Sequence, residues 1–536
     1  MAKQLISQPL PNFGVNGLNT QSNPNSLDPS YLTSADNIVL RESGRISFRK
    51  GLKQKVVPSG ASINSIIEHN DQGTNKIFAS HGTSIYTIDF TSPNAAFPSS
   101  GADVKHTVGS TTGDWQFINF NNRLTCLHTG IVPQRYDGSQ SSGSRWAAFD
   151  NATRPPSVTS GEFKPSCGSG AYGRMWVGGV EEEKDVLHYS ALLDSDDYTL
   201  SSGGGSIDLK KVWDEDDIIA VAPFYGQLAV FGKNNIAIYE SPDVIGSIKL
   251  NEVIKGIGCI ARDSVQAIGD DLVFLSNTGL RSLARTSEKD KVPLTDISKN
   301  IKDTLIRNIG ASDLTDVRSV YVENEGIYIL SFTDSNINYV FDFKHFTPNG
   351  EPRITTWTFD NDREPTSMCY TDTYGYLTGQ KDGGIAGYEG YFDTDLAWVS
   401  SAASYTNSGI TADVSSIWIP LSQGAVASLL KRMILVLEGG SGSTLGLRWY
   451  KDFGVVSSDT TQISLRPATT GTTALYGNAA ALYGASKYSP IYGLQEYSTP
   501  LTGSAKTLKV NMSIVSNGYN ASIQDLSILH LQGKIR

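Results

Sequence analysis

A segment of about fifty residues recurs along the first 400 positions, and this repeat limits the possible folds more than any other feature of the sequence. Each copy contains a short apolar strand, a turn with Gly or Asn, a second strand, another such turn and a third strand. The clearest copies are FYGQLAVFGKNNIAIY, from Phe224 to Tyr239, and AIGDDLVFLSNTGLRSL, from Ala267 to Leu283. Tight turns between alternating apolar strands are typical of a β-meander.

The first apolar residue after the first turn fixes the register of each copy. These residues are Ile77, Leu124, Met175, Leu228, Leu272, Ile327 and Leu377, at steps of 47, 51, 53, 44, 55 and 50 positions. Such a step is about the length of one four-stranded propeller blade. One small sheet cannot bury its own apolar face, so the copies must pack face to face, and radial closure protects their edges. The sequence therefore predicts an all-β fold with a β-propeller of six to eight blades. A β-sandwich, the alternative, would lack this longer period.

The pattern changes after residue 400, where long strands replace the short repeats. We expect an N-terminal arm and hairpin at 1–55, propeller blades at 56–398, a Ser, Thr and Ala-rich linker at 399–416, and an additional C-terminal β-sandwich-like domain at 417–536. The long strands are expected at Leu429–Glu438, Thr444–Tyr450, Lys506–Val515 and Ser522–Leu531. Within this domain, residues 466–503 are rich in Gly, Ala, Tyr and Thr and form a candidate extended loop.

Charge and hydropathy restrict the functional classes. The formal net charge of −10 disfavours tight non-specific binding to duplex DNA, which depends on Lys and Arg neutralising phosphates. The start of the chain has no apolar run of signal-peptide length, and no stretch reaches the roughly 18 apolar residues of a spanning helix. We therefore expect no membrane anchor and synthesis in a cytoplasm.

The sequence contains none of the common spacings of metal or catalytic residues. The four cysteines belong to no CxxC pair, so buried reduced thiols are expected at Cys126, Cys167, Cys259 and Cys369. The seven histidines show no HExxH or H-x-H spacing, and GxSxG and phosphate-loop motifs are absent. We expect no enzyme activity, no catalytic residue, no cofactor and no metal site.

Three acidic clusters are the strongest exceptions to this expectation. They lie at Glu181–Glu183, Asp194–Asp197 and Asp214–Asp217, and none matches the calcium loop D-x-[DN]-x-[DN]-G. Solvated loops between blades are the expected explanation. Paired carboxylates for glycoside hydrolysis stay open, because their separation is set in space and not in sequence.

Basic residues gather near the N-terminus. They are Arg41, Arg45, Arg49, Lys50, Lys53 and Lys55, and they alternate with apolar residues in NIVLRESGRISFRKGL. This alternation predicts a two-strand hairpin that turns at Ser43-Gly44. Its rim could contact a partner protein or a phosphate.

The stretch DPSYLTSADNIVLRESGRISFRKGLK, from Asp28 to Lys53, carries a recognisable pattern. It has an A-x-N-hydrophobic strand, a Gly turn, and then an arginine before R-x-G. The corresponding positions are Ala35, Asn37, Gly44, Arg45, Arg49 and Gly51, with Lys50 inserted where the family often joins Arg to Gly. In this respect the chain resembles podovirus tail nozzle, or tail hub, proteins, also called tail tubular protein B or packaged-DNA stabilisation proteins. The phrase GQLAVFGKNNIAIY and the ending SNGYNASIQDLSILHLQGKIR are similar to the same family.

The resemblance implies a structural protein of the virion tail, assembled in the host cytoplasm. It implies a homo-hexamer below the portal and adaptor proteins, with double-stranded genomic DNA in its lumen and tail fibres or spikes docked outside. We expect DNA retention to depend on a rim loop of the propeller or on the 466–503 stretch. The alternatives are a glycan-binding or depolymerising tail protein and a cellular propeller that scaffolds other proteins.

Overall fold

The computed structural model describes the chain except for residues 1–4, 42–43, 58, 91–96, 98–100, 102, 110–114, 214, 245, 285–295, 360–362, 392–409, 422–425, 440–442, 458, 466–493, 517–519 and 533–536. The chain divides into two compact units. We call Gln54–Asn338 with Asn361–Gly387 the propeller unit. We call Met1–Lys53 with Tyr339–Asp360 and Tyr388–Arg536 the two-sheet unit.

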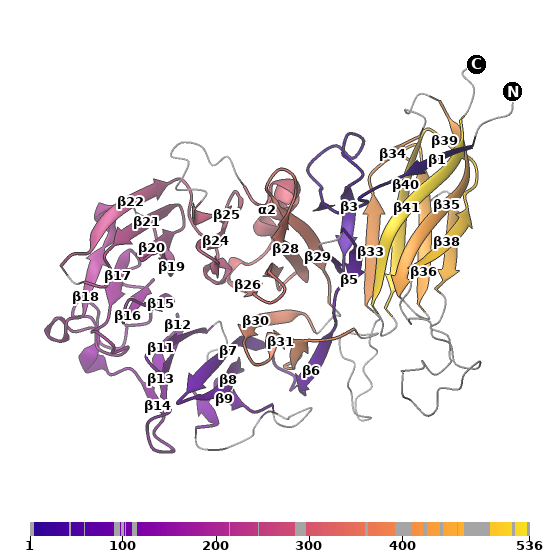
Figure 1. The fold of residues 1–536 in the computed structure, drawn as a ribbon. Helices are drawn as coiled ribbons and strands as arrows, with labels where there is room; N and C mark the ends of the chain where they lie inside the picture. The colour runs from indigo at the N-terminus through magenta and orange to yellow at the C-terminus, as the bar shows by residue number, and fades with distance from the viewer. Residues whose placement is uncertain are drawn as a thin grey trace, which may run out of the picture. The chain divides into compact units, whose positions relative to one another are not determined.

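Six separate sheets of three or four strands, and one further set of strands, follow one another in the propeller unit (Figure 1). The separate sheets are β7 (Ile63–Asp71), β8 (Thr74–His81), β9 (Ser84–Ile88) and β10 (Lys105–Thr107); β11 (Gln116–Phe120), β12 (Arg123–His128), β13 (Ile131–Asp137) and β14 (Trp146–Ala148); β15 (Cys167–Ala171), β16 (Arg174–Gly178), β17 (Val186–Tyr189) and β18 (Gly205–Asp208); β19 (Ile218–Phe224), β20 (Gln227–Gly232), β21 (Asn235–Glu240) and β22 (Lys249–Lys255); β23 (Gln266–Ile268), β24 (Asp271–Ser276) and β25 (Gly279–Ser282); and β30 (Pro365–Thr371), β31 (Gly375–Gln380) and β32 (Ile385–Tyr388) with β6 (Leu52–Val56).

The further set is β26 (Val317–Val322), β27 (Ile327–Phe332) and the start of β28 (Ile337–Phe346), and it occupies a seventh position between β23 and β30. Residues 339–346 of β28 belong to the two-sheet unit. The first strands contact one another in chain order from β7 to β19 and from β23 to β30. The turn η4 (Arg262–Ser264), which precedes β23, contacts both β19 and β26. Because β30 also contacts β7, the ring closes. This arrangement confirms the predicted all-β propeller.

The predicted register of the repeat is confirmed. Each of the seven register residues lies in the second strand of its blade, and each is almost fully buried. The predicted copy from Phe224 to Tyr239 covers the end of β19 together with β20 and β21. The copy from Ala267 to Leu283 covers β23, β24 and β25. Tight turns and alternating apolar residues were therefore sufficient to place the repeat correctly.

The fifth sheet differs from its neighbours because it has three strands in the described part of the chain. The helix α2 (Lys302–Ala311) contacts its outer strand β25. Short 3-10 turns complete the helical content: η1 (Asn151–Thr153), η2 (Leu200–Ser202), η3 (Leu209–Lys211), η5 (Lys299–Ile301) and η6 (Leu314–Asp316). In the described part of the chain, no helix is long and apolar enough to cross a membrane.

Two sheets make up the two-sheet unit. The first has the order β38 (Leu494–Pro500), β35 (Ser428–Gly439), β41 (Ala521–Leu531), β5 (Ile46–Phe48) and β4 (Ile38–Leu40), with β1 (Leu5–Pro9) on β41 and β39 (Ser504–Ala505) on β35. Within this unit the second has the order β28, β29 (Pro352–Trp357), β2 (Gly17–Leu18), β3 (Tyr31–Asp36), β33 (Thr411–Ser416), β40 (Thr507–Val515), β36 (Thr444–Lys451) and β37 (Asp459–Ser464), with β34 (Ile419–Pro420) on β40.

Alternating apolar residues bury one face of each sheet. In β40, Leu508, Val510, Met512 and Ile514 are buried while the residues between them are partly exposed. Side chains from β4, β5 and β41 line a small apolar gap together with side chains from β33 and β40. The two sheets therefore pack face to face, and the four predicted long strands are confirmed within them as β35, β36, β40 and β41.

The compact units differ from the predicted domain boundaries. Residues 1–53 and 339–360 belong to the same unit as residues 417–536. β2 pairs in parallel with both β29 and β3, a long-range pairing that local periodicity cannot reveal. The end of the predicted linker 399–416 forms β33, and residues 494–500 of the predicted loop 466–503 form β38. Residues 399–409 and 466–493 lie outside the described residues.

Replacing a register residue tests the packing of the repeat. We expect Leu228→Ala to destabilise the propeller unit by about 2–5 kcal/mol, because it leaves a cavity between neighbouring sheets. The control Leu250→Ala, at a 42% exposed position of β22, should cost well under half as much. Thermal and denaturant unfolding measure both. Equal effects of the two substitutions would contradict the assigned register.

Candidate functional site

A cavity of about 480 Å³ lies where the first strands of the blades meet. Its wall is formed by β7, β11, β23, β26 and β30 together with the turn η4. The lining is largely polar, and it includes the side chains of Gln116, Arg262, Asp263, Arg318 and Glu323. We call this cavity the central channel of the propeller unit.

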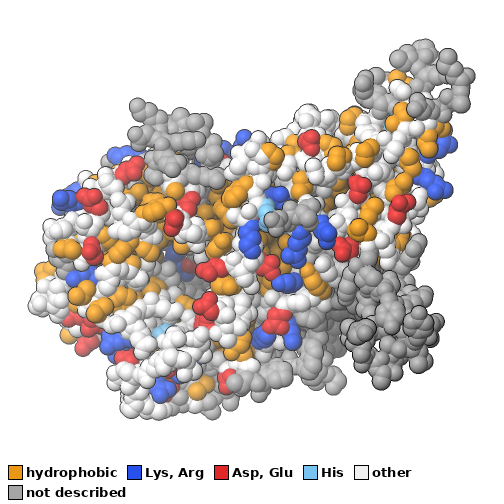
Figure 2. All heavy atoms as spheres, in the orientation of Figure 1, with side chains coloured by type: hydrophobic (Ala, Val, Ile, Leu, Met, Phe, Trp, Pro, Cys, Tyr) orange, Lys and Arg blue, Asp and Glu red, His pale blue; other side chains and the backbone are white. Residues whose placement is uncertain are grey.

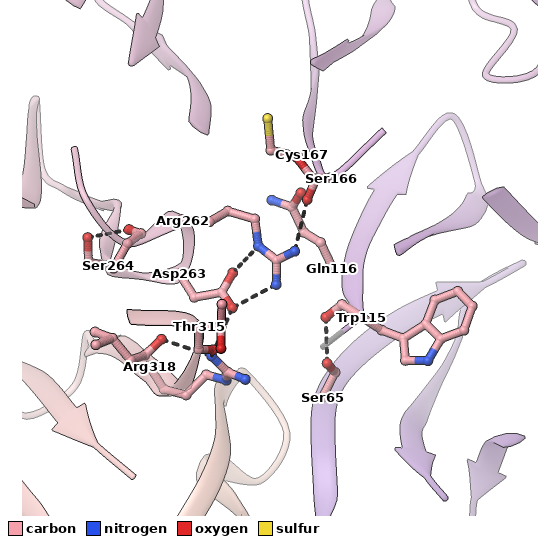
Figure 3. Close-up of polar contacts among 12 residues, drawn as sticks. Ser65, Trp115, Gln116, Ser166, Cys167, Arg262, Asp263, Ser264, Thr315 and Arg318 are labelled. Carbon is pink, nitrogen blue, oxygen red and sulfur yellow. Dashed lines mark hydrogen bonds and ion pairs between the residues drawn. The ribbon is translucent and has the colours of Figure 1, made fainter. Parts of the chain in front are cut away.

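Side chains in the channel wall bond to the backbone of the next blade (Figure 3). The Ser65 hydroxyl of β7 donates to the carbonyl of Trp115, which precedes β11. The Gln116 amide donates to the carbonyl of Gly168 at 3.1 Å and accepts from the Gly168 N–H at 2.8 Å, joining β11 to β15. The Ser367 hydroxyl of β30 donates to the carbonyl of Ile63 at 2.8 Å, which joins the last blade to the first.

Arg262, Asp263 and Arg318 form an ion triad in the same wall (Figure 3). The Arg262 guanidinium donates to both Asp263 oxygens, at 2.7 and 2.8 Å, and to the Ser166 carbonyl at 2.9 Å. Arg318 lies 3.4 Å from the second Asp263 oxygen and donates to the carbonyls of residues 315 and 317. Ser166 precedes β15 of the third sheet, Arg262 and Asp263 precede β23 of the fifth, and Arg318 lies in β26. The triad thus links these three blades by charge-assisted hydrogen bonds.

The triad keeps Asp263 ionised. Burial alone would raise the pKa of Asp263, but the charge and hydrogen bonds of Arg262 and the charge of Arg318 outweigh it and lower that pKa below 3.8. A general acid in glycoside hydrolysis needs a raised pKa. Glu323 also lines the channel, so the channel does hold two carboxylates, but Asp263 has the wrong protonation state to donate a proton. Both Asp263 oxygens accept from Arg262, so the triad forms a hydrogen-bonded polar wall.

The N-terminal motif forms a second polar cluster, inside the two-sheet unit. Asn37 has a left-handed backbone with φ of 55°, a conformation that Asn tolerates better than most residues. Its side-chain amide donates to the Thr358 hydroxyl and the Thr411 carbonyl, both at 2.9 Å, and its oxygen accepts from Arg49 at 2.7 Å. Arg49 is buried, donates to the Thr358 carbonyl at 3.0 Å and lies 4.7 Å from the Phe359 ring centre.

The other motif positions support this cluster or lie at its edge. Ala35 is buried in β3 opposite Val414. Gly44 has φ of 77° in the turn between β4 and β5, which confirms the predicted hairpin. Arg45 pairs with Glu438 at 2.9 Å on the surface. The Gly51 N–H donates to the Gly390 carbonyl at 3.0 Å. The structure therefore brings Asn37 and Arg49 together and leaves Arg45 outside.

The acidic clusters have structural partners. Asp194 pairs with Arg123 at 3.2 Å, and Asp196 pairs with Arg135. Asp216 accepts the backbone N–H groups of residues 233 and 234 at 3.0 and 2.8 Å, which fixes the turn between β20 and β21. Glu183 lies 3.2 Å from His188, whose pKa is lowered to about 4 by burial. Among the residues that the structure describes, no group of three or more His, Cys, Asp and Glu is placed to hold a metal ion.

The cysteines lie in the protein interior. Cys126, Cys167 and Cys259 are buried, and Cys369 is partly buried and lines the channel. Burial raises the pKa of Cys167 to about 12 and that of Cys259 to about 11. Thiols with such high pKa values are poor nucleophiles at neutral pH.

Comparisons with known proteins concern the fold. No protein-family model matches the sequence, and no curated protein matches it. Among solved structures, Raptor of Chaetomium thermophilum is 12% identical with a TM-score of 0.42, over 64% of this chain and 30% of that chain. The β-propeller domain of Myceliophteria thermophila Cps50 (Swd1) is 9% identical with a TM-score of 0.38, and the match covers 63% of this chain and 98% of that domain. The WD40 domain of Neurospora crassa Pan2 is 8% identical with a TM-score of 0.39, and the match covers 64% of this chain and 97% of that domain. The architecture described above follows from this chain's own strand order.

The channel residues carry no local pattern in the sequence. Gln116, Arg262, Asp263 and Arg318 belong to no residue motif that the repeat copies share, and adjacent Arg and Asp are common on surfaces. Their position at or just before the first strand of a blade was the one available signal.

The lowered pKa of Asp263 makes its contribution depend on pH. The pKa of Asp263 is lower in the folded state than its ordinary value of 3.8. The ionised carboxylate therefore stabilises folding fully when the pH is above 3.8, and this stabilisation is lost as the pH falls through the pKa of the folded state. We expect Asp263→Asn to destabilise the propeller unit by about 2–3 kcal/mol at pH 7, since hydrogen bonds to charged groups are lost. Denaturant titrations at several pH values should show variant and wild type converging in acid. The exposed control Asp270→Asn, in the same sheet, should have little effect at any pH, and a pH-independent loss in the Asp263 variant would contradict this role.

The Asn37–Arg49 cluster is tested by removing its charge. Arg49→Met should destabilise the two-sheet unit by about 2–4 kcal/mol, because buried acceptors lose their donor. The matched control Arg45→Met breaks an ion pair whose arginine is 44% exposed, and should cost less than about 1 kcal/mol. Hydrogen exchange resolves the two units, and an equal effect of both variants would contradict the assigned roles.

Proposed function

We propose that this chain is a non-enzymatic structural subunit of a short phage tail. In this proposal six copies form a nozzle ring below the portal and adaptor, retain the packaged genome, conduct DNA during ejection and help to dock tail fibres or spikes. The observation that carries the proposal is the placement of the tail-nozzle-like motif. Asn37 and Arg49 of this motif are buried inside the two-sheet unit and hydrogen-bonded to each other.

This placement supports the resemblance for a physical reason. A short degenerate motif can match by chance at surface positions, where most residue types are tolerated. Position 37 combines a left-handed backbone with five side-chain hydrogen bonds, and position 49 combines burial with a planar donor. Few residue types meet these demands. The motif therefore specifies a particular junction, where residues 356–358 and 411 meet the N-terminal hairpin.

The propeller unit suits a structural subunit because its channel wall is joined blade to blade. The carbonyls of Ile63, Trp115 and Gly168 each accept from a side chain of a neighbouring blade. Such bonds hold a ring of sheets in one geometry, which a subunit needs if it must present fixed surfaces to several neighbours. Heterologous contacts between copies close a ring when the rotation between them is right.

Charge supports passage of DNA without adhesion. Six chains of net charge −10 carry −60 in total. On the face shown in Figure 2, Lys and Arg side chains are interspersed with Asp and Glu and form no broad basic field. On this face duplex DNA would meet no surface that neutralises many phosphates.

Mass measurement and class-averaged electron microscopy of the purified protein test the proposal, alone and with a lysate of its source particle. We expect sixfold rings, or monomers that form rings when tail components are added. Duplex DNA should show little retention on these rings over a salt series. A monomer that joins no particle and cleaves a polysaccharide would overturn the proposal, and strong salt-sensitive DNA binding would overturn the non-adhesive lumen.

A further inference from the structure

An apolar turn projects from the two-sheet unit between β36 and β37. Val455 is 93% exposed, Val456 is 78% exposed and Phe453 is 52% exposed. We call residues 453–456 the valine turn. Single exposed apolar side chains are common on protein surfaces, but neighbouring ones form a continuous apolar tip. Such a tip is expected where a surface meets an apolar partner.

The shape of the valine turn is fixed by the residues around it. Asp452 and Phe453 have left-handed backbones, with φ of 49° and 64°. The Asp452 carboxylate accepts the backbone N–H groups of residues 506 and 507 at 2.7 and 3.1 Å, which holds this conformation. The Phe453 ring lies 5.0 Å from the ring of Trp418, a partly exposed residue just before β34. The turn is therefore preorganised, and binding its tip costs little conformational entropy.

Four basic residues lie at the same end of the two-sheet unit as the turn. They are Lys431, Arg432, Lys451 and Lys506, and we call them the basic collar. The Lys451 ammonium donates to the Thr502 carbonyl at 3.4 Å. The Lys431 carbonyl accepts from the neighbouring Leu501 N–H at 3.0 Å, and Lys506 ends the same connection, directly before β40. Figure 1 shows β34 and β39 at this end of the unit.

The basic collar carries uncompensated positive charge. The side chains of Arg432 and Lys451 donate to a hydroxyl and to a carbonyl, and none of the four residues forms an ion pair with a carboxylate that the structure describes. The segments that meet here, 428–432, 449–464 and 501–507, contain these four cations and two acidic residues, Asp452 and Asp459. Their difference is an excess of two positive charges, in a chain whose net charge is −10.

The apolar tip, the aromatic pair and the basic collar follow one another from the tip of the turn to its base. A bilayer surface offers partners in the same order: acyl chains, the interface at which Trp is favoured, and head groups whose phosphates attract Lys and Arg. Duplex DNA would match the collar but would leave Val455 and Val456 in water. A protein partner would have to offer an apolar cavity with an acidic rim. The arrangement therefore favours a lipid surface.

We propose that this end of the two-sheet unit docks on the surface of a bilayer that contains anionic phospholipids. The valine turn enters the boundary between head groups and acyl chains, and the basic collar lies against the phosphates. The contact is peripheral and reversible, because three apolar side chains bury little area in the lipid. The inference goes beyond the proposed function and does not rest on it, since a single copy carries the whole surface.

Cosedimentation of the full chain with vesicles tests this docking. The probes are vesicles of phosphatidylcholine alone and vesicles with equal amounts of phosphatidylcholine and phosphatidylglycerol. We expect the wild type to bind the mixed vesicles at least about tenfold more tightly, because each Lys or Arg near the surface adds to the attraction by anionic lipid. Added salt should reduce this difference, since it screens exposed charges.

Substitutions at the tip and in the collar separate the two contributions. Val455→Asp should weaken binding to the mixed vesicles at least about fivefold, because a charged tip must stay in water. Lys506→Glu should weaken it at least about fivefold and reduce its salt dependence. The controls Leu250→Asp and Lys255→Glu, at exposed positions of β22, should bind as the wild type does. All four positions are exposed or partly exposed, so thermal unfolding should be unchanged.

Fluorescence of Trp418 shows whether the valine turn itself meets the lipid. Its emission should shift to shorter wavelength with mixed vesicles, and Trp418→Phe should remove this shift while binding persists. A wild type that ignores mixed vesicles, binds phosphatidylcholine equally well, or is insensitive to Val455→Asp and Lys506→Glu would overturn the inference. Self-association without lipid that Val455→Asp abolishes would also overturn it, because the turn would then bind a second copy. Ring formation is measured without lipid, so the proposed function would stand in each case.

Discussion

The hydrogen bonding of β6 to β32 closes the propeller, and the other blades depend on that closure. β6 precedes the first blade in the sequence but supplies the fourth strand of the last one. Each blade is a small sheet that cannot bury both of its faces alone. The core is accordingly shared between neighbours: one cluster joins Val56 and Ile63 to Leu377, another joins Leu187 to Leu228, and a third joins Phe231 to Phe274. Opening the ring at β6 would expose the first of these clusters and then weaken the next.

Closure also explains the polar channel. The first strands of the blades meet around the axis, where side chains of one blade reach the backbone of the next. Ser65, Gln116 and Ser367 satisfy carbonyl groups in this way, and Arg262 reaches across to Ser166. A buried carbonyl without a partner costs free energy, so these side chains stabilise the one arrangement that satisfies them. The polar wall is therefore a consequence of ring closure and not an added feature.

The repeat was predictable from the sequence because its turns and strands depend on residues that are close together in the chain. The Gly and Asn turns and the alternation of apolar and polar residues correctly predicted that Leu124, Leu228 and the other register residues lie in second strands. Both signals depend on only a few neighbouring residues. Long-range pairing was not predictable in this way: β33 lies in a Ser and Thr-rich stretch and becomes a strand because β3 and β40 flank it. The triad of Arg262, Asp263 and Arg318 was missed for the same reason, since two blades bring it together. The N-terminal motif was found as a pattern, and the structure supplied the reason for its Asn and Arg.

Hydrogen exchange of β6 and β30–β32 tests closure most directly. If β6 closes the ring, its amides should be as protected as those of β31 and should exchange only with global opening of the propeller unit. β6 amides that exchange rapidly while β30–β32 remain protected would contradict the account, because the last blade would then be stable without the strand that precedes the first.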